Sequence, residues 1–153
     1  MGQQPQKTGI DIKLFLPHRA PMLMVDAILE ISPSRVLCSF RITDDNIFVK
    51  DGRFQEAGLM ENMAQTCSSI VGQTLYDDNY NPKSDRRVIG FISGVKQMTV
   101  FELPEIGDEI WTESTLTSQF DGEDYAICTM AVEAKRADRL LSRAEINLFL
   151  KHS

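Results

Sequence analysis

Histidine and cysteine, the side chains best suited to proton transfer, nucleophilic attack or metal binding near neutral pH, are few in this sequence. The histidines are His18 and His152, and His152 lies one residue from the end. The cysteines, Cys38, Cys67 and Cys128, are widely spaced and form no CxxC pair. A zinc site needs clustered Cys and His ligands, so we expect no metal centre. We expect the cysteines to be small buried hydrophobic residues.

Among the acidic residues, Glu61 has the most informative position. It lies in the first turn of a predicted helix, and Gln65 lies one turn further along the same helix face. A carboxyl group held there could act as a general acid or base. The alternative is that Glu61 interacts only with the helix dipole, which is worth about 0.3–1 kcal/mol. The pattern of residues alone favours this second interpretation.

One long helix and several strands must position these side chains. Apolar residues, among them Leu59, Met63 and Cys67, recur at helical spacing from Gly58 to about Tyr76. Gly9–Leu16 predicts a short helix, and the Ser32-Pro33-Ser34 sequence predicts a hairpin turn. The predicted strands are Met22–Ile31, Arg35–Ile42, Val88–Phe101, Glu109–Gln119, Tyr125–Lys135 and Leu140–Leu150. One long helix packed on an antiparallel sheet is an α+β pattern.

Length, composition and charge exclude several classes of function. The chain has 153 residues, of which 42% are hydrophobic and 25% are charged, as expected of one globular domain. We expect residues 1–8 to be a disordered tail and residues 9–153 to form a single domain. Sixteen basic and 22 acidic residues give a net charge of −6, which argues against nucleic-acid binding, because that needs a basic face. No signal peptide or transmembrane segment is visible, so we expect a cytoplasmic protein that does not bind membranes.

Three stretches, taken in order, resemble one enzyme family. Leu16–Asp26 (LPHRAPMLMVD) is similar to the LPHRxPxLxxD opening of the 3-hydroxyacyl-[acyl-carrier-protein] dehydratases of the FabZ/FabA type. Glu61–Gln65 (ENMAQ) matches the E-x-M-A-Q motif on their central helix. Gly94–Phe101, followed by Pro104 to Asp108 (PEIGD), is similar to their strand that enters a P-x-x-x-G-D turn, here with a shorter spacing.

The resemblance implies an α+β hotdog fold, in which a curved antiparallel sheet wraps one long helix. It also implies a dimer with its acyl channel along the subunit interface. Such dehydratases remove water from a 3-hydroxyacyl thioester that is carried on the phosphopantetheine of an acyl carrier protein, and they need no further cofactor. They use a histidine from one subunit and a carboxylate from the central helix of the other. The catalytic positions that carry over are Glu61 and Gln65.

The histidine of the family does not carry over. In the family it lies in a G-H-F-P segment before the helix, and the corresponding Asn46–Arg53 of this chain contains no histidine. Loss of a general base costs on the order of 10²–10⁴ in rate. Asp51-Gly52 in this stretch predicts a turn, and the stretch resembles a His-less dehydratase-like branch associated with aryl-polyene pigment gene clusters. His18 lies in the opening motif, where the family histidine is mostly structural.

Two hypotheses follow from this departure. In the first, the chain is a dehydratase-like subunit of fatty-acid or polyene-type biosynthesis that keeps Glu61 and depends on a His-bearing dehydratase paralogue. The dimer would then be a heterodimer rather than a homodimer. In the second, the chain is a non-catalytic scaffold subunit that binds acyl chains or the carrier protein. A hotdog thioesterase is a third alternative, for which the sequence offers no motif.

The candidate substrate-binding residues are His18, Gly90, Phe91 and Gly94. The last three lie on the strand that begins at Val88, and the glycines permit close approach of a ligand or a backbone. Ordinary core packing explains this strand equally well.

A carrier-protein partner requires a local basic patch, because acyl carrier proteins are acidic and this chain is acidic too. The adjacent Arg86 and Arg87 are the best candidates for it, and Lys50, Arg53 and Lys96 are further ones. The alternative is that these are solvated loop charges.

Overall fold

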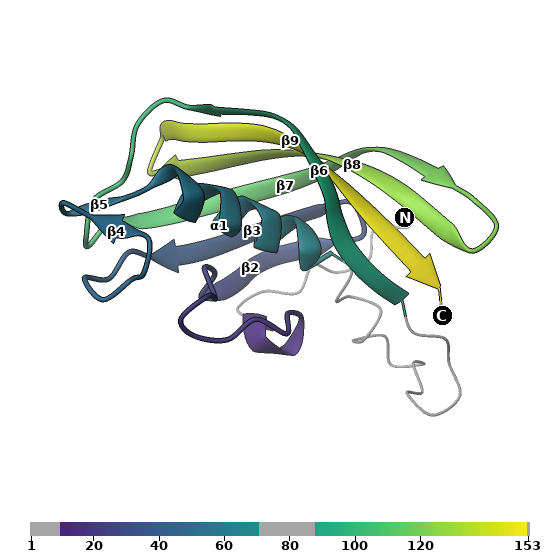
Figure 1. Cartoon of the computed structure of the whole chain (residues 1–153), viewed down its shortest axis with the longest axis horizontal. Helices are drawn as coiled ribbons and strands as arrows, with labels where there is room; N and C mark the ends of the chain where they lie inside the picture. Colours follow the sequence, from purple (N-terminus) through teal and green to yellow (C-terminus); the bar gives the residue numbers. More distant parts are fainter. Residues whose placement is uncertain (1–9, 71–87, 153) are drawn as a thin grey trace.

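The computed structural model describes residues 10–70 and 88–152, so the predicted tail at residues 1–8 lies outside the described part. A sheet of seven antiparallel strands has the order β1-β2-β3-β7-β8-β9-β6, and β4-β5 forms a separate hairpin. Helix α1 lies across one face of the curved sheet (Figure 1), which is the expected α+β arrangement. The elements are β1 (Ile10–Asp11), η1 (Ile12–Leu14), β2 (Ala27–Ser32), β3 (Arg35–Arg41), β4 (Val49–Lys50), β5 (Arg53–Phe54), α1 (Glu56–Ser68), β6 (Val88–Val100), β7 (Glu109–Asp121), β8 (Tyr125–Arg136) and β9 (Arg139–His152).

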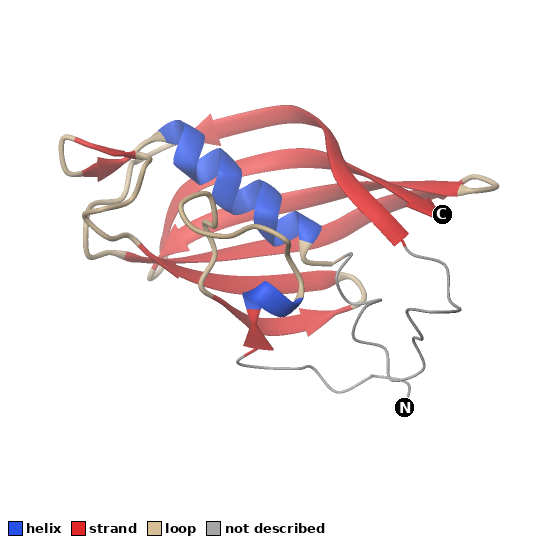
Figure 2. Cartoon of the chain, turned by 60° about the horizontal axis from the view of Figure 1, so that its bottom comes forward, coloured by secondary structure: helices blue, strands red, loops and turns tan. Residues whose placement is uncertain are grey.

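The predicted strands of the C-terminal half are confirmed, with small shifts of their ends. β8 pairs with β7 and β9, and β9 also pairs with β6, which places β6 at one edge of the sheet (Figure 2). In β8 the predicted alternation holds, since every second residue from Ala126 to Val132 is buried. These side chains face α1, and the residues between them lie on the opposite face.

Helix α1 begins earlier and ends earlier than the apolar pattern predicts. It starts at Glu56, where the preceding Gln55 makes no side-chain cap, and it ends at Ser68. The predicted continuation from residue 71 to 76 lies outside the described residues. Gly58 lies inside the helix, and a side chain would not fit there, because its Cβ would lie only 2.5 Å from the ring of Phe54. Neither α1 nor any other helix among residues 10–70 and 88–152 is long and apolar enough to cross a membrane.

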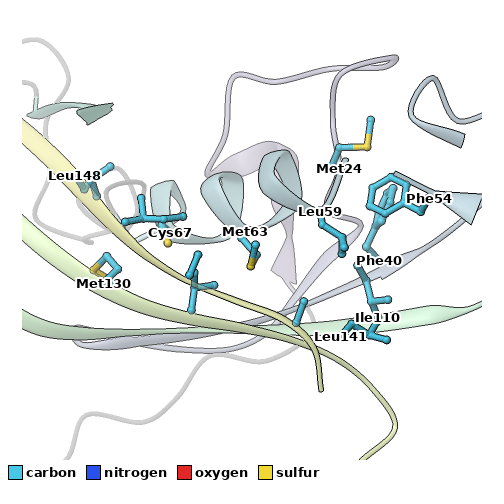
Figure 3. Packing of buried hydrophobic residues seen from close by; sticks show 14 of the residues in the cluster. Met24, Phe40, Phe54, Leu59, Met63, Cys67, Ile110, Met130, Leu141 and Leu148 are labelled. Carbon is cyan, nitrogen blue, oxygen red and sulfur yellow. The ribbon is translucent and has the colours of Figure 1, made fainter. Parts of the chain in front are cut away.

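The main core lies between α1 and the sheet, as Figure 3 shows. The predicted helix face is confirmed, because Leu59, Met63 and Cys67 are fully buried. Burial of each large apolar side chain contributes about 1.5–3 kcal/mol. The sheet residues that meet this face include Ile110, Met130, Leu141, Ile146 and Leu148. A second cluster, around Phe15 and Ile28, packs beneath the N-terminal segment.

The N-terminal part departs from prediction in two places. Gly9–Leu16 was expected to be a short helix, but the described residues form the two-residue strand β1 and the short 3₁₀ helix η1, where Asp11 accepts a hydrogen bond from the N–H of Lys13. The first predicted strand, Met22–Ile31, starts only at Ala27. The backbone of residues 22–24 bonds to side chains of α1 instead of to a neighbouring strand. The Pro33-Ser34 turn between β2 and β3 is confirmed.

The PEIGD sequence forms the turn between β6 and β7. Gly107 adopts a positive φ of 92°, a conformation that favours glycine. Oδ2 of Asp108 accepts hydrogen bonds from the N–H of Glu105 at 2.9 Å and from Arg136 at 2.8 Å. The backbone of the same turn bonds to Ile42 at the end of β3. The turn motif therefore joins three parts of the sheet, which is a structural role.

Candidate functional site

Glu61 lies on the side of α1 that the sheet does not cover. It is in the second turn of the helix, not the first, because the helix starts at Glu56. The first-turn carboxylate that interacts best with the helix dipole is therefore Glu56. Glu61 is partly exposed, and beside it Met60 is 40% exposed, whereas Leu59 and Met63 are fully buried. The Glu61 carboxylate thus faces away from the core of its own chain.

Gln65 is the residue that holds this carboxylate. Its side chain is 1% exposed, and Nε2 donates a hydrogen bond to Oε2 of Glu61 at 3.0 Å. Nε2 also donates to the carbonyl of Met22 at 2.8 Å, and Oε1 accepts from the N–H of Met24 at 2.7 Å. The two predicted catalytic residues are therefore in direct contact, and Gln65 ties the pair to the loop before β2, which Figure 2 shows against α1.

Asn62 and Thr112 extend this network into the core, although neither residue was predicted to belong to the site. Asn62 is 1% exposed, and its Nδ2 donates to the carbonyl of Met24 at 2.7 Å. Oδ1 of Asn62 accepts from the hydroxyl of Thr112 on β7 at 2.5 Å. A signal was present, since Thr112 and Ser114 occupy alternate positions of a strand with one covered face. Both residues are fully buried against α1.

In the Asn46–Arg53 segment, where the resemblance places the histidine of the family, Phe48 packs against another aromatic residue. The ring of Phe48 packs edge-on against Phe54 at a centroid distance of 6.5 Å. The backbone N–H of Phe48 donates a hydrogen bond to Oδ1 of Asn46 at 2.8 Å. Asp51 and Gly52 adopt positive φ angles of 53° and 77° at the β4-β5 turn, as the sequence predicts. Among the described residues, no hydrogen bond or ion pair joins this segment to Glu61.

His18 is half-buried in the loop between η1 and β2. Its Nδ1 is buried and has no hydrogen-bond partner among the described residues. Its carbonyl oxygen accepts a hydrogen bond from Arg19 at 2.7 Å. Among the described residues, the hydrogen bonds that tie this loop to α1 begin at Met22. The contacts of His18 therefore do not join it to Glu61.

Among the described residues, no hydrogen bond or ring contact joins the predicted substrate-binding residues of β6 to Glu61. Phe91 pairs with Phe149, and their rings lie 5.2 Å apart on the sheet face opposite α1. Gly94 lies beside a β-bulge, and a Cβ there would meet nothing within 4 Å. Gly90 pairs with Leu150 at the start of the strand. Arg86 and Arg87, the predicted docking residues, lie outside the described residues.

The cysteines are free and buried, as predicted. Burial raises the pKa of the Cys38 and Cys67 thiols to about 12, and it also raises the pKa of Cys128. Thiols of this kind are not nucleophiles at neutral pH. Within residues 10–70 and 88–152, no three His, Cys, Asp or Glu side chains gather in a way that could hold a metal ion.

Comparison with known sequences gives one family over almost the whole chain. The model of the ApeP-like family, described as ApeP dehydratase, matches residues 10–152. The 3-hydroxyacyl-[acyl-carrier-protein] dehydratase FabZ of Shewanella loihica is 28% identical over 150 residues, covering 92% of each chain. FabZ of Shewanella oneidensis is 27% identical over 146 residues, covering 90% of this chain and 92% of its own.

Comparison with solved structures establishes the fold. The dehydratase heterocomplex ApeI:P from Xenorhabdus doucetiae contains a chain that superposes with a TM-score of 0.75 at 19% identity, covering 92% of this chain and 90% of that one. A hypothetical thioesterase with coenzyme A from Streptococcus pneumoniae has a TM-score of 0.59 at 9% identity, with coverages of 82% and 85%. At these identities the likeness concerns the fold, and it confirms the predicted hotdog architecture.

Proposed function

The chain belongs to the ApeP-like dehydratase family, and we propose that it is the carboxylate-bearing subunit of a two-chain 3-hydroxyacyl-[acyl-carrier-protein] dehydratase. Its pathway would be of the fatty-acid or polyene type. The observation that carries the proposal is the position of Glu61. Gln65 fixes this carboxylate on the uncovered side of α1, and the Asn46–Arg53 segment of the same chain contains no histidine.

The proposed reaction divides acid and base between two chains. A histidine of the partner removes the proton from the α-carbon of the thioester, and Glu61 in its acid form donates a proton to the β-hydroxyl. The C–H and C–O bonds break, a C=C bond forms and water leaves. The proton gained by histidine and the proton lost by Glu61 are exchanged with solvent before the next turnover. The substrate arrives on the phosphopantetheine of a carrier protein, so the chain itself needs no cofactor.

Two observations support a second chain. β6 has 13 residues, and in the described sheet only one of its sides is paired, through β9. A long edge strand presents N–H and C=O groups that another chain can pair with. The second observation is that the ApeI:P structure is a complex of two different dehydratase chains. A His-bearing paralogue is therefore the partner that we propose for this chain.

The test is reconstitution from purified chains. This chain and a His-bearing paralogue are assayed separately and together with a 3-hydroxyacyl carrier protein, and loss of water is followed by mass spectrometry. We expect this chain to be inert alone and to raise the activity of the mixture, and we expect Glu61→Gln to remove that increase. If Glu61→Gln leaves the mixture fully active, the carboxylate has no chemical role. Acyl-chain binding without any acceleration would instead favour a non-catalytic scaffold.

Carrier-protein docking is a further part of the proposal. Lys50 and Arg53 lie opposite each other on the β4-β5 hairpin, directly before α1, and both are exposed. Neither makes an ion pair with another described residue. Together with Arg86 and Arg87, they are the cations that we propose for an acidic carrier protein. Charge reversal at each pair should weaken binding most at low salt, and a pair whose reversal has no effect is not part of the docking surface.

A further inference from the structure

A continuous chain of hydrogen bonds connects the core of the sheet to the Glu61 carboxylate. The Thr112 hydroxyl bonds to Oδ1 of Asn62, and Nδ2 of Asn62 bonds to the carbonyl of Met24. The N–H of Met24 bonds to Oε1 of Gln65, and Nε2 of Gln65 bonds to Oε2 of Glu61. The donor–acceptor distances along this path lie between 2.5 and 3.0 Å. Met24 is fully buried beside Leu59 of the helix (Figure 3).

The backbone of Met24 fixes the orientation of both side-chain amides. A carbonyl oxygen can only accept, so the nitrogen of Asn62 must face the Met24 carbonyl and its oxygen must face Thr112. A backbone N–H can only donate, so the oxygen of Gln65 must face the Met24 N–H. Gln65 therefore presents an N–H group to Glu61. Every bond along the path donates toward the carboxylate, and the two halves of the path meet at the backbone of Met24, whose C=O and N–H belong to neighbouring peptide groups.

This orientation distinguishes the two oxygens of Glu61. Oε2 accepts from Gln65 at 3.0 Å, whereas no described residue bonds to Oε1. Both N–H groups of Gln65 are used, one by Glu61 and one by the Met22 carbonyl. The amide therefore cannot turn away without losing bonds to the loop. The oxygen that remains available to a substrate is Oε1.

We infer that Thr112 and Asn62 are positioning residues, which act through Met24 and Gln65 to aim Oε1 of Glu61 at the substrate hydroxyl. This inference rests on the proposed function for the identity of the substrate. The hydrogen-bond path from Thr112 to Gln65 is a property of the isolated chain, so this part of the inference does not depend on the proposed function. Small displacements of a catalytic group cost up to about 10²-fold in rate, so a defect at Thr112 should lower kcat without altering substrate binding.

Ser114 provides a matched control on the same strand. It is fully buried like Thr112 and also faces α1, but its hydroxyl contacts the sulfur of Cys67 at 3.1 Å and lies outside the path to Glu61. Thr112→Val and Ser114→Ala each remove one buried hydroxyl. Thr112→Ser keeps the hydroxyl and should restore the path. A purely structural role for Thr112 would make the two hydroxyl-deleting variants behave alike.

The experiment has one arm in the isolated chain and one in the reconstituted enzyme. In the isolated, folded chain, the side-chain amide resonances of Gln65, assigned with Gln65→Leu, should move in Thr112→Val and stay in place in Ser114→Ala and Thr112→Ser. In the mixture, Thr112→Val should lower kcat by roughly 10- to 100-fold with KM unchanged, and the other two should not.

Gln65 resonances that do not respond to Thr112→Val overturn the inference, whatever the activity of the mixture. Equal losses of kcat in Thr112→Val and Ser114→Ala also overturn it. A mixture that is inactive with the wild-type chain contradicts the proposed function, while the resonances of the isolated chain still decide the inference.

Discussion

Gln65 and Met24 lie 41 residues apart in the sequence, and a 2.7 Å hydrogen bond joins the N–H of Met24 to Oε1 of Gln65. The same amide contacts Glu61 and the carbonyl of Met22. One buried side chain thus secures both the loop before β2 and the carboxylate of the proposed site. The segment that resembles the opening motif of the dehydratases and the segment that resembles their helix motif are in this way physically joined.

Replacement of Gln65 should therefore destabilise the protein as well as impair catalysis. Gln65→Leu keeps much of the volume but leaves the buried N–H of Met24 without a partner, which costs about 1–3 kcal/mol. The free energy of unfolding, measured by urea denaturation, should fall by that amount. Gln119→Leu, at an exposed position of β7, should change it by less than about 0.5 kcal/mol. Equal effects of the two substitutions would contradict the role given to Gln65.

Gly58 and Gly94 should differ in how much stability the protein loses when a methyl group is added. In Gly58→Ala the new Cβ would lie 2.5 Å from the ring of Phe54 and 2.8 Å from Cβ of Phe48, and such overpacking costs about 1–3 kcal/mol. In Gly94→Ala the Cβ would enter open space, and the stability should change by less than about 1 kcal/mol. Thermal or urea denaturation of both variants checks this. A Gly58→Ala variant as stable as the wild type would show that the two aromatic rings move aside easily.

Arg136 should stabilise the protein in a pH-dependent way. Burial alone would raise the pKa of Asp108, but the N–H of Glu105 and the guanidinium of Arg136 outweigh it and lower that pKa below the usual 3.8. The stabilisation is therefore present above about pH 4 and is lost as the pH falls through the lowered pKa of the folded state. Arg136→Met should cost about 1–2 kcal/mol at pH 7, with a difference from the wild type that shrinks below about pH 4.

The control for Arg136 is Lys135→Met. Lys135 pairs with Glu133 at 3.6 Å on the exposed face, and such exposed pairs contribute little. Urea denaturation of both variants is measured at several pH values. At neutral pH, Arg136→Met should lower the free energy of unfolding more than Lys135→Met does. A cost of Arg136→Met that is unchanged at acidic pH would mean that the ion pair with Asp108 is not its origin.

The thiols should not react in the folded protein. Because burial raises the pKa of Cys38 and Cys67 to about 12, almost no thiolate exists at pH 8. We expect iodoacetamide to leave both unmodified in the native state and to modify both after unfolding in urea, as read by mass spectrometry. Rapid labelling of either cysteine in the native protein would be inconsistent with this burial.

The sequence predicted those parts of the fold that depend on local periodicity. The alternation in β8 and the spacing of Leu59, Met63 and Cys67 both mark faces that are buried in the structure. The start of α1 was missed because Gln55 gives no side-chain cap, and hence no local signal. The segment at Met22–Met24 resembles a strand in composition, but its backbone bonds to Asn62 and Gln65.

The candidate site was predicted only in part. Glu61 and Gln65 were found through the resemblance, since a carboxylate in a helix is not distinctive by itself. The alternation of β7 marks Thr112 as facing inward, but its pairing with Asn62 was not predicted, because the two residues lie 50 positions apart in the sequence. The assignment of Phe91 to substrate binding stays a prediction, and the pairing of β6 with β9 places its ring beside Phe149.

The central claim, that Glu61 completes the active site of another chain, is tested most directly by complementation of an inactivated partner. A His-bearing paralogue whose own helix carboxylate has been replaced by glutamine should be inactive alone, because it retains only the base. Addition of this chain should restore dehydration of a 3-hydroxyacyl carrier protein, and addition of its Glu61→Gln variant should leave the mixture at least about 10²-fold slower. If this chain restores nothing, or if Glu61→Gln restores as much as the wild type, Glu61 does not complete the site of another chain.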